Sequence, residues 1–179
     1  MSQPASLYLE GECTLVKVRE LSPEDEQQVL LLRQEALSEH PLAFSSSPEE
    51  DRMNSQSYQK QMASDDHALF GAVDGEEVVG MVGLLRYRAL KVRHTSYIWG
   101  SYLRSSYRGQ GAGRQMMNGL IERARSWGCE SVDLGVSSAA PEARQLYLSL
   151  GFVPYGLRER AIIWEETVAD EEHMSLDLR

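Results

Sequence analysis

The stretch YRGQGAG, residues 107–113, decides how this sequence is interpreted, because it places three glycines within five positions. Before it, residues 96–103 (SYIWGSYL) carry the aromatic and β-branched residues that favour a strand. After it, residues 114–124 (RQMMNGLIERA) repeat their apolar residues at helical spacing. The glycines therefore stand where a predicted strand ends and a predicted helix begins.

A glycine-rich turn at the start of a helix is suited to binding phosphate. The first N–H groups of a helix have no partner inside it, and the helix dipole makes that end positive. Glycines also let a bulky anion approach the backbone closely. Two familiar phosphate-binding patterns do not fit: a P-loop needs Gly-Lys-Ser/Thr, and the dinucleotide pattern needs a sixth-position glycine counted from Gly109. Arg114 stands where the P-loop requires a lysine and where the dinucleotide pattern requires its last glycine.

Length and composition predict one globular domain spanning residues 1–179. Hydrophobic residues make up 42% and charged residues 25% of the chain, as in soluble proteins. No apolar run approaches the roughly 18 residues of a membrane span. The first residues, MSQPASLYLEGE, lack the basic flank and apolar centre of a signal peptide, so we expect a cytoplasmic protein without a membrane partner. Cys13 and Cys129 form no disulfide or metal pattern, and no metal is expected.

Charge is unevenly distributed along the chain. The net charge of −9 argues against nucleic acid as a partner. No acidic residue occurs between Glu77 and Glu122, and that interval includes seven cations: Arg86, Arg88, Lys91, Arg93, Arg104, Arg108 and Arg114. Two readings are open, a charge-poor core with solvated arginines or a local positive field for a polyanionic small molecule. The second is favoured because the glycine turn lies in this interval.

The periodicity predicts eleven elements in the order β-α-α-β-β-β-α-β-α-β-β. We expect strands over 13–21, 67–73, 76–88, 92–104 and 129–136 and a final hairpin within 152–178. We expect helices over 22–40, 48–62, 111–127 and 141–150. Such an order indicates a mixed α/β domain whose first half is largely antiparallel.

Two motifs resemble those of one enzyme superfamily. The pattern Arg108-x-x-Gly111-x-Gly113, after a strand and opening a helix, resembles the acyl-CoA-binding motif of the GNAT N-acetyltransferases. Residues 143–152 (ARQLYLSLGF) resemble the second signature of that superfamily, an Ala, then Leu-Tyr, then Gly-Phe. The resemblance covers roughly residues 14–178. It implies an α/β (α+β) fold with a central mixed, mostly antiparallel sheet flanked by helices.

The resemblance implies acetyl-CoA as co-substrate and assigns roles to the matching positions. The backbone of Ser101, Tyr102 and Leu103 would pair with the pantetheine arm, and Arg108 would shape the turn. Backbone amides would surround the pyrophosphate, and these belong to Gly109, Gln110, Gly111, Ala112, Gly113 and Arg114.

The implied chemistry is direct attack on the acetyl thioester by an amine of a small molecule or peptide. Tyr147 matches the tyrosine that commonly protonates the leaving thiolate, and a phenol of pKa near 10 is protonated at neutral pH. The alternative is a core tyrosine near the end of a short helix. The general base stays open between His94, His173 and a water chain.

One position departs from the family pattern, and the acceptor stays undefined. Ala140 stands where relatives often have an Asn that contacts the cofactor, so one contact is lost or is supplied by Ser137 or Ser138. Arg33 could pair with a substrate carboxylate or with a nearby Glu35 or Glu39. An acidic set could attract a cationic amine or form a solvated hairpin: Glu165, Glu166, Asp170, Glu171 and Glu172.

Two functions are compatible with these observations, an N-acetyltransferase and a non-catalytic acyl-CoA-binding sensor or interaction module. Tyr147 favours the enzyme, whereas Ala140 and the undefined base leave room for the sensor. A larger acyl donor is also allowed, since no residue limits the acyl size. The edges of such a sheet allow two copies of the chain to pair as a homodimer.

Overall fold

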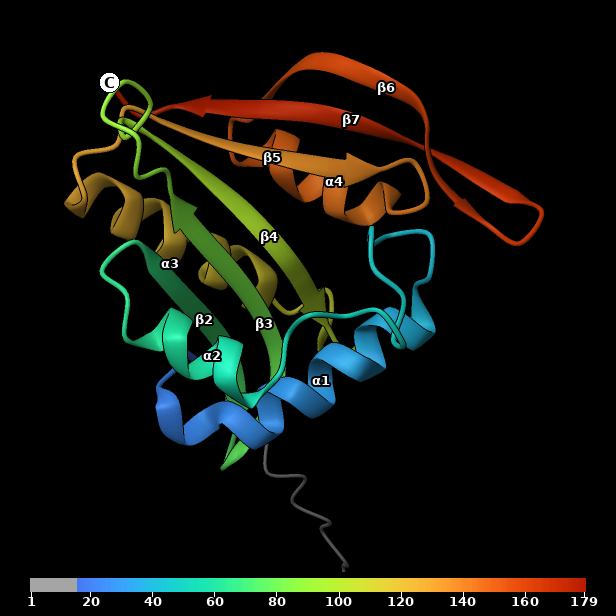
Figure 1. Ribbon diagram of the computed structural model, residues 1–179, viewed down its shortest axis with the longest axis horizontal. Helices are drawn as coiled ribbons and strands as arrows, with labels where there is room; N and C mark the ends of the chain where they lie inside the picture. Colours follow the sequence, from blue (N-terminus) through green and yellow to red (C-terminus); the bar gives the residue numbers. More distant parts are fainter. Residues whose placement is uncertain (1–15) are drawn as a thin grey trace, which may run out of the picture.

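The computed structural model describes residues 16–179, and these form a seven-stranded sheet with helices on both faces (Figure 1). The strand order is β1-β2-β3-β4-β5-β7-β6, and every neighbouring pair is antiparallel except β4 with β5. The strands are β1 (Lys17–Glu20), β2 (His67–Asp74), β3 (Glu77–Arg86), β4 (Thr95–Leu103), β5 (Ser131–Ser137), β6 (Val153–Trp164) and β7 (Thr167–Asp177). The α-helices are α1 (Glu26–Glu39), α2 (Ser55–Met62), α3 (Ala112–Ser126) and α4 (Pro141–Ser149), and η1 (Pro23–Asp25) and η2 (Ser105–Tyr107) are short 3-10 turns. The predicted fold class and element order are confirmed.

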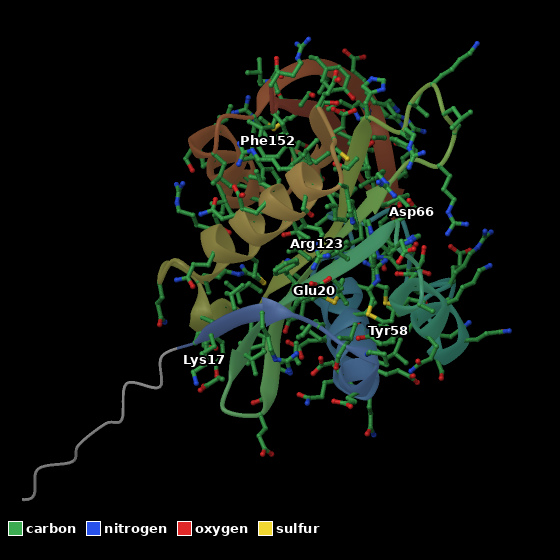
Figure 2. All side chains as sticks on the ribbon, turned by 90° about the vertical axis from the view of Figure 1, so that its left-hand side faces the viewer. Lys17, Glu20, Tyr58, Asp66, Arg123 and Phe152 are labelled. Carbon is green, nitrogen blue, oxygen red and sulfur yellow. The ribbon has the colours of Figure 1, made fainter. Side chains whose placement is uncertain are left out.

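Two apolar layers hold the sheet between the helices. On one face, α3 and α4 pack on a cluster that includes Ile98, Leu134 and Met174. On the other face, α1 and α2 pack on a second cluster centred on β2 and β3, in which Tyr58 is fully buried. Figure 2 shows Glu20 of β1 beside Arg123 of α3, and their ion pair joins the edge strand to that helix.

The first helix begins with a 3-10 turn that the side chain of Asp25 closes. Asp25 accepts hydrogen bonds from the Ser22 backbone N–H at 2.8 Å and from two nitrogens of Arg19, each at 2.7 Å. The carboxylate of Asp25 thereby closes η1 and ties it to β1. The hydrogen bonds from Arg19, partly opposed by desolvation, hold the pKa of this carboxyl below its usual value.

The predicted start of the second helix is wrong by seven residues. Residues 48–51 form a turn, and α2 begins at Ser55. Asn54 caps it, because its side chain accepts the Ser57 N–H at 3.0 Å while the Ser57 hydroxyl accepts the Asn54 N–H at 2.8 Å. Asp51 does not cap a helix and instead pairs with Arg33 of α1 at 3.1 Å.

Two predicted strand boundaries also change. The strand expected over 92–104 begins at Thr95, because Val92 and Thr95 donate backbone hydrogen bonds within a tight turn over 89–95. The first strand covers Lys17–Glu20, and Cys13 lies outside the described residues. Neither change moves an element to another place in the sheet.

The parallel pair of β4 and β5 opens toward the C-terminal ends of the two strands. Pairing of β4 with β5 runs from Thr95↔Ser131 to Ile98↔Leu134, and both strands then continue without pairing to each other. A bulge in β4, where Gly100 has a φ of +64°, turns the strand away at this point. Figure 1 shows β4 and β5 diverging from there. We call this opening the splay, and the sites described below lie around it.

Candidate functional site

A cleft of about 590 Å³ lies at the splay, between the end of β4, the start of α3 and α4. The α1–α2 connection closes it on one side. Its lining residues are His40, Ala43, Phe44, Ser101, Tyr102, Leu103, Arg108, Gly109, Gly111, Gly113, Arg114, Met116, Ala139, Ala140, Glu142, Ala143 and Leu146. The cleft therefore brings together two stretches that the sequence singled out, residues 101–103 and the glycine turn.

The glycine turn has the backbone that its sequence predicts. Gly109 and Gly111 have φ of +74° and +88°, a left-handed conformation that side-chain-bearing residues rarely adopt. Gly111 is the N-cap of α3, so the first N–H groups of that helix lie at the cleft without helical partners. No atom lies within 4 Å of where a Cβ would stand on Gly109 or Gly111. This open space beside a positive helix end is suited to an anionic group.

Arg108 holds the shape of this turn. Its Nε donates to the Leu103 carbonyl at 2.8 Å, and its Nη2 lies 3.1 Å from Nε2 of His40. The side chain thus joins the end of β4 to the α1–α2 connection. Arg114, one turn into the helix, donates to the Ser149 hydroxyl at 2.6 Å and braces α3 against α4.

The positive field expected between residues 77 and 122 is partly neutralised by carboxylates from outside the interval. Arg86 and Arg88 both pair with Asp66, at 2.8 and 2.9 Å. Arg104 pairs with Glu35 at 2.8 Å, and Glu35 comes from α1, outside the interval. The sequence reading missed these pairs because the carboxylates are distant along the chain. At the cleft itself the positive groups are the N-terminus of α3, Arg114 and Arg108, and Arg108 lies 3.8 Å from the carboxylate of Glu142.

Tyr102 anchors β4 to α1 while its backbone faces the cleft. The phenol is buried and donates toward the carboxylates of Glu35 and Glu39, which lie 2.9 and 2.7 Å away. Burial, together with these carboxylates, raises the pKa of Tyr102 well above its ordinary value. The strand end is therefore fixed in position by its own side chain.

Tyr147 lies behind the cleft rather than in its wall. The residue is 5% exposed and packs against Phe152, with ring centroids 6.0 Å apart. Burial raises its pKa, and a hydrogen bond with the Ser101 side chain acts in the opposite direction. Ser101 itself lines the cleft, whereas Tyr147 does not.

Several residues considered from the sequence lie elsewhere. Gln110 and Ala112 do not line the cleft: Gln110 donates to the Ser106 carbonyl at 3.0 Å, and Ala112 is buried. His94 lies in a smaller pocket at the start of β4, away from the splay. Ser137 and Ser138 accept backbone N–H groups at 3.1 and 3.0 Å and do not line the cleft, so the structure gives no substitute for the missing Asn at position 140.

Arg33 has a different partner from those that the sequence suggested. It pairs with Asp51 rather than with the neighbouring Glu35 or Glu39, and both side chains are almost buried, at 11% and 5% exposure. Its guanidinium also lies over the Phe44 ring, 5.2 Å from the centroid. Phe44 and His40 line the cleft from the α1–α2 connection, which no sequence motif marked as part of this wall.

Among residues 16–179, no cluster of three or more His, Cys, Asp or Glu side chains is arranged to hold a metal ion. In the same range, none of the helices combines the length and apolar character needed to span a membrane.

Solved structures with the same fold cover nearly the whole chain. An acetyltransferase of the GNAT family from Streptococcus pneumoniae is 24% identical, with a TM-score of 0.79 over 91% of this chain and 99% of that one. The protein yncA from Salmonella typhimurium, solved with its cofactor acetyl-CoA, is 19% identical, with a TM-score of 0.79 over 92% and 94%. A ribosomal-protein-alanine N-acetyltransferase from Brucella melitensis is 22% identical, with a TM-score of 0.75 over 90% and 99%. No curated protein sequence gives a significant match.

The sequence profile of the acetyltransferase (GNAT) family matches residues 30–152, which include the α1–α2 connection, the glycine turn and α4. The chain therefore belongs to the acetyltransferase (GNAT) family and is an acetyl-CoA-dependent N-acetyltransferase.

Proposed function

We propose that this enzyme transfers the acetyl group of acetyl-CoA directly to a primary amine of a small molecule or peptide. The observation that carries the proposal is the cleft at the splay, which joins the end of β4 that no longer pairs with β5 to the glycine turn of α3. An extended arm can pair with the first, and a pyrophosphate can bind at the second. The alternative of a non-catalytic sensor needs only this binding.

The residues of the cleft fit acetyl-CoA. The backbone of Ser101 and Leu103 lies along the cleft where β4 has no β5 neighbour, and it supplies the hydrogen-bonding edge that a pantetheine arm needs. Gly109 and Gly111 leave room for the pyrophosphate beside the unpaired N–H groups of the helix, and Gly113 lets the helix lie close to Leu146 of α4. When bound, acetyl-CoA supplies a thioester carbonyl as the electrophile.

Tyr147 is the proposed proton donor. Its buried phenol has a raised pKa and is therefore protonated at neutral pH. Ser101 lines the cleft and influences the pKa of this phenol, so we propose that Tyr147 gives its proton to the departing thiolate by way of the Ser101 hydroxyl. Bulk solvent then restores the proton to the phenol.

The edge of the sheet supports a homodimer. Strand β6 pairs on one side only and exposes large apolar side chains along its length, namely Val153, Tyr155, Leu157, Ile163 and Trp164. A second copy of the chain would cover this surface. Light scattering across a concentration series would show a mass of twice 20.2 kDa if the edge pairs and 20.2 kDa if it does not.

A calorimetric titration tests the proposed function. Acetyl-CoA and free CoA should bind, and NAD should not. A panel of primary amines should then release free thiol from acetyl-CoA in proportion to the enzyme concentration. Binding without thiol release from any amine would support the sensor. Failure of acetyl-CoA to bind a folded sample would contradict the assignment of the cleft.

A further inference from the structure

A second set of polar groups meets at the splay, on the face opposite α3 and α4. Gly135 is the first residue of β5 beyond its last pairing with β4. Oε1 of Glu171 and the hydroxyl of Tyr97 lie 2.7 and 3.1 Å from the point where a Cβ on Gly135 would stand. A Cβ at position 135 would displace the ends of these two side chains, which come from β7 and β4.

Helices cover only part of this face of the sheet. Helices α1 and α2 pack on β2, β3 and β4. Glu171 and His173 of β7 lie on the same face as Gly135 of β5, because Gly135 and His173 are directly opposite in the ladder. The Glu171 side chain is 25% exposed, so a solute can reach it from this side.

The groups that face Glu171 come from four strands. His173 Nε2 lies 3.6 Å from its Oε2, and Tyr155 of β6 stacks on His173 with centroids 6.1 Å apart. Tyr97 of β4 is half-buried, and its pKa is raised by burial first and by Glu171 next. Arg158 of β6 is opposite Glu171 in register, and it is exposed. Asp133 of β5 lies on the same face, in the second-to-last residue pair before β4 and β5 separate. The pKa of Tyr155 is raised chiefly by burial and next by the charge of Asp133.

Four other carboxylates near the splay are already engaged, whereas Asp133 has no such partner in the described part of the chain. Glu35 pairs with Arg104, and Asp51 pairs with Arg33. Glu172 pairs with Arg144 at 2.8 Å, and Glu39 accepts the Tyr102 hydroxyl at 2.7 Å. Within residues 16–179, Glu171 has no arginine or lysine at ion-pair distance and only His173 beside it. Its carboxylate is therefore available to a cationic group of a substrate.

We infer that Glu171 is the proton acceptor for the amine substrate, positioned by Tyr97 over Gly135. The inference rests on the proposed function and supplies the base that no motif identified. Glu171 takes one proton from the arriving ammonium, which leaves a neutral nitrogen with a lone pair. The nitrogen–carbon bond to the acetyl group then forms as the carbon–sulfur bond breaks. A second nitrogen proton is lost as the departing sulfur gains one, so the products are an amide, a thiol and protonated Glu171.

The test compares Glu171→Gln with Asp133→Asn, a matched carboxylate on the same face. Both variants and the unmodified protein are titrated with acetyl-CoA by calorimetry and assayed for thiol release with two kinds of amine. One amine is strongly basic, such as the best primary alkylamine of the panel. The other is methoxyamine, which is already unprotonated at neutral pH.

Glu171→Gln should bind acetyl-CoA normally and lose about 100-fold in kcat/KM with the alkylamine, the usual contribution of a general base. It should lose far less with methoxyamine, because that nitrogen needs no deprotonation before attack. Asp133→Asn should keep both rates within about threefold of the unmodified protein. Equal losses for both amines, or a larger loss in Asp133→Asn, would overturn the role of Glu171. Absence of thiol release from the unmodified protein would overturn the proposed function and this inference with it.

Discussion

Replacing Gly111 by alanine should weaken acetyl-CoA binding far more than it destabilises the fold. At a φ of +88°, a Cβ costs roughly 1–2 kcal/mol of folding free energy. For a chain of this size that is a fall in Tm of about 2–8 °C. No atom lies within 4 Å of the new methyl group, so no clash adds to this cost. The methyl group would instead occupy the space from which an anion reaches the first N–H groups of α3.

The loss of one hydrogen bond to a charged group is worth about 1.5–3 kcal/mol. The Kd for acetyl-CoA should therefore rise at least about tenfold, since 1.4 kcal/mol corresponds to a factor of ten. Gly75→Ala is the matched control, because Gly75 has a φ of +59°, equally open surroundings and a place in the β2–β3 turn away from the cleft. Calorimetry measures the loss of affinity for acetyl-CoA, and thermal unfolding measures the loss of stability. Unchanged affinity in Gly111→Ala, or equal weakening in Gly75→Ala, would refute the assigned anion site.

Three further predictions concern a buried phenol and two ion pairs. Tyr147→Phe should lower kcat about 100-fold and leave the Kd for acetyl-CoA unchanged, and an unaltered kcat would remove the phenol from the reaction. Asp51→Ala should lower the free energy of unfolding, measured in urea, by about 3 kcal/mol, because it leaves the guanidinium of Arg33 unpaired at 11% exposure. A loss below about 1 kcal/mol would mean that water solvates this guanidinium. The folded-state pKa of Asp25 is lowered, chiefly by hydrogen bonds from Arg19, so its stabilising contribution is present above the unfolded pKa of about 4 and is lost as pH falls through the lower folded value. Asp25→Asn should thus be less stable at neutral pH and show a shallower acid decline in urea midpoints, and parallel pH profiles would contradict this linkage.

The family, the fold class and the element order followed from the sequence because local signals specify them. Periodicity located the elements, and the left-handed φ of Gly109 and Gly111 is what two glycines at a strand-to-helix turn predict. The predicted start of α2 was wrong because a tertiary contact decides it. Pro48 resembles a helix start, but Asp51 pairs with Arg33 of α1 and does not belong to the helix. A local pattern carries no information about a partner 18 residues away.

The residues of the cleft were predictable to different degrees. Those on the motif itself, such as Gly111 and Gly113, line the cleft where expected. Their contacts with acetyl-CoA, like the role of Tyr147, stay predictions. Ala139 and His40 carry no signature of their own and reach the cleft only because β5 and α1 end beside the splay.

The splay explains why the proposed donor and acceptor groups lie on opposite faces of one sheet. A continuous sheet would separate a ligand between α3 and α4 from any group on the face of Gly135. Parallel pairing of β4 and β5 ends at Ile98↔Leu134, and the bulge at Gly100 turns β4 away immediately beyond it. A thioester held along β4 would therefore be reachable through the sheet at this one position, where Tyr97 and Glu171 meet. Closing the opening should abolish turnover even if acetyl-CoA still binds. Gly135→Val tests this, because the valine side chain would lie against both oxygens. Calorimetry measures the binding of acetyl-CoA, and thiol release measures turnover. Full activity in a folded Gly135→Val enzyme would show that the amine approaches by another route.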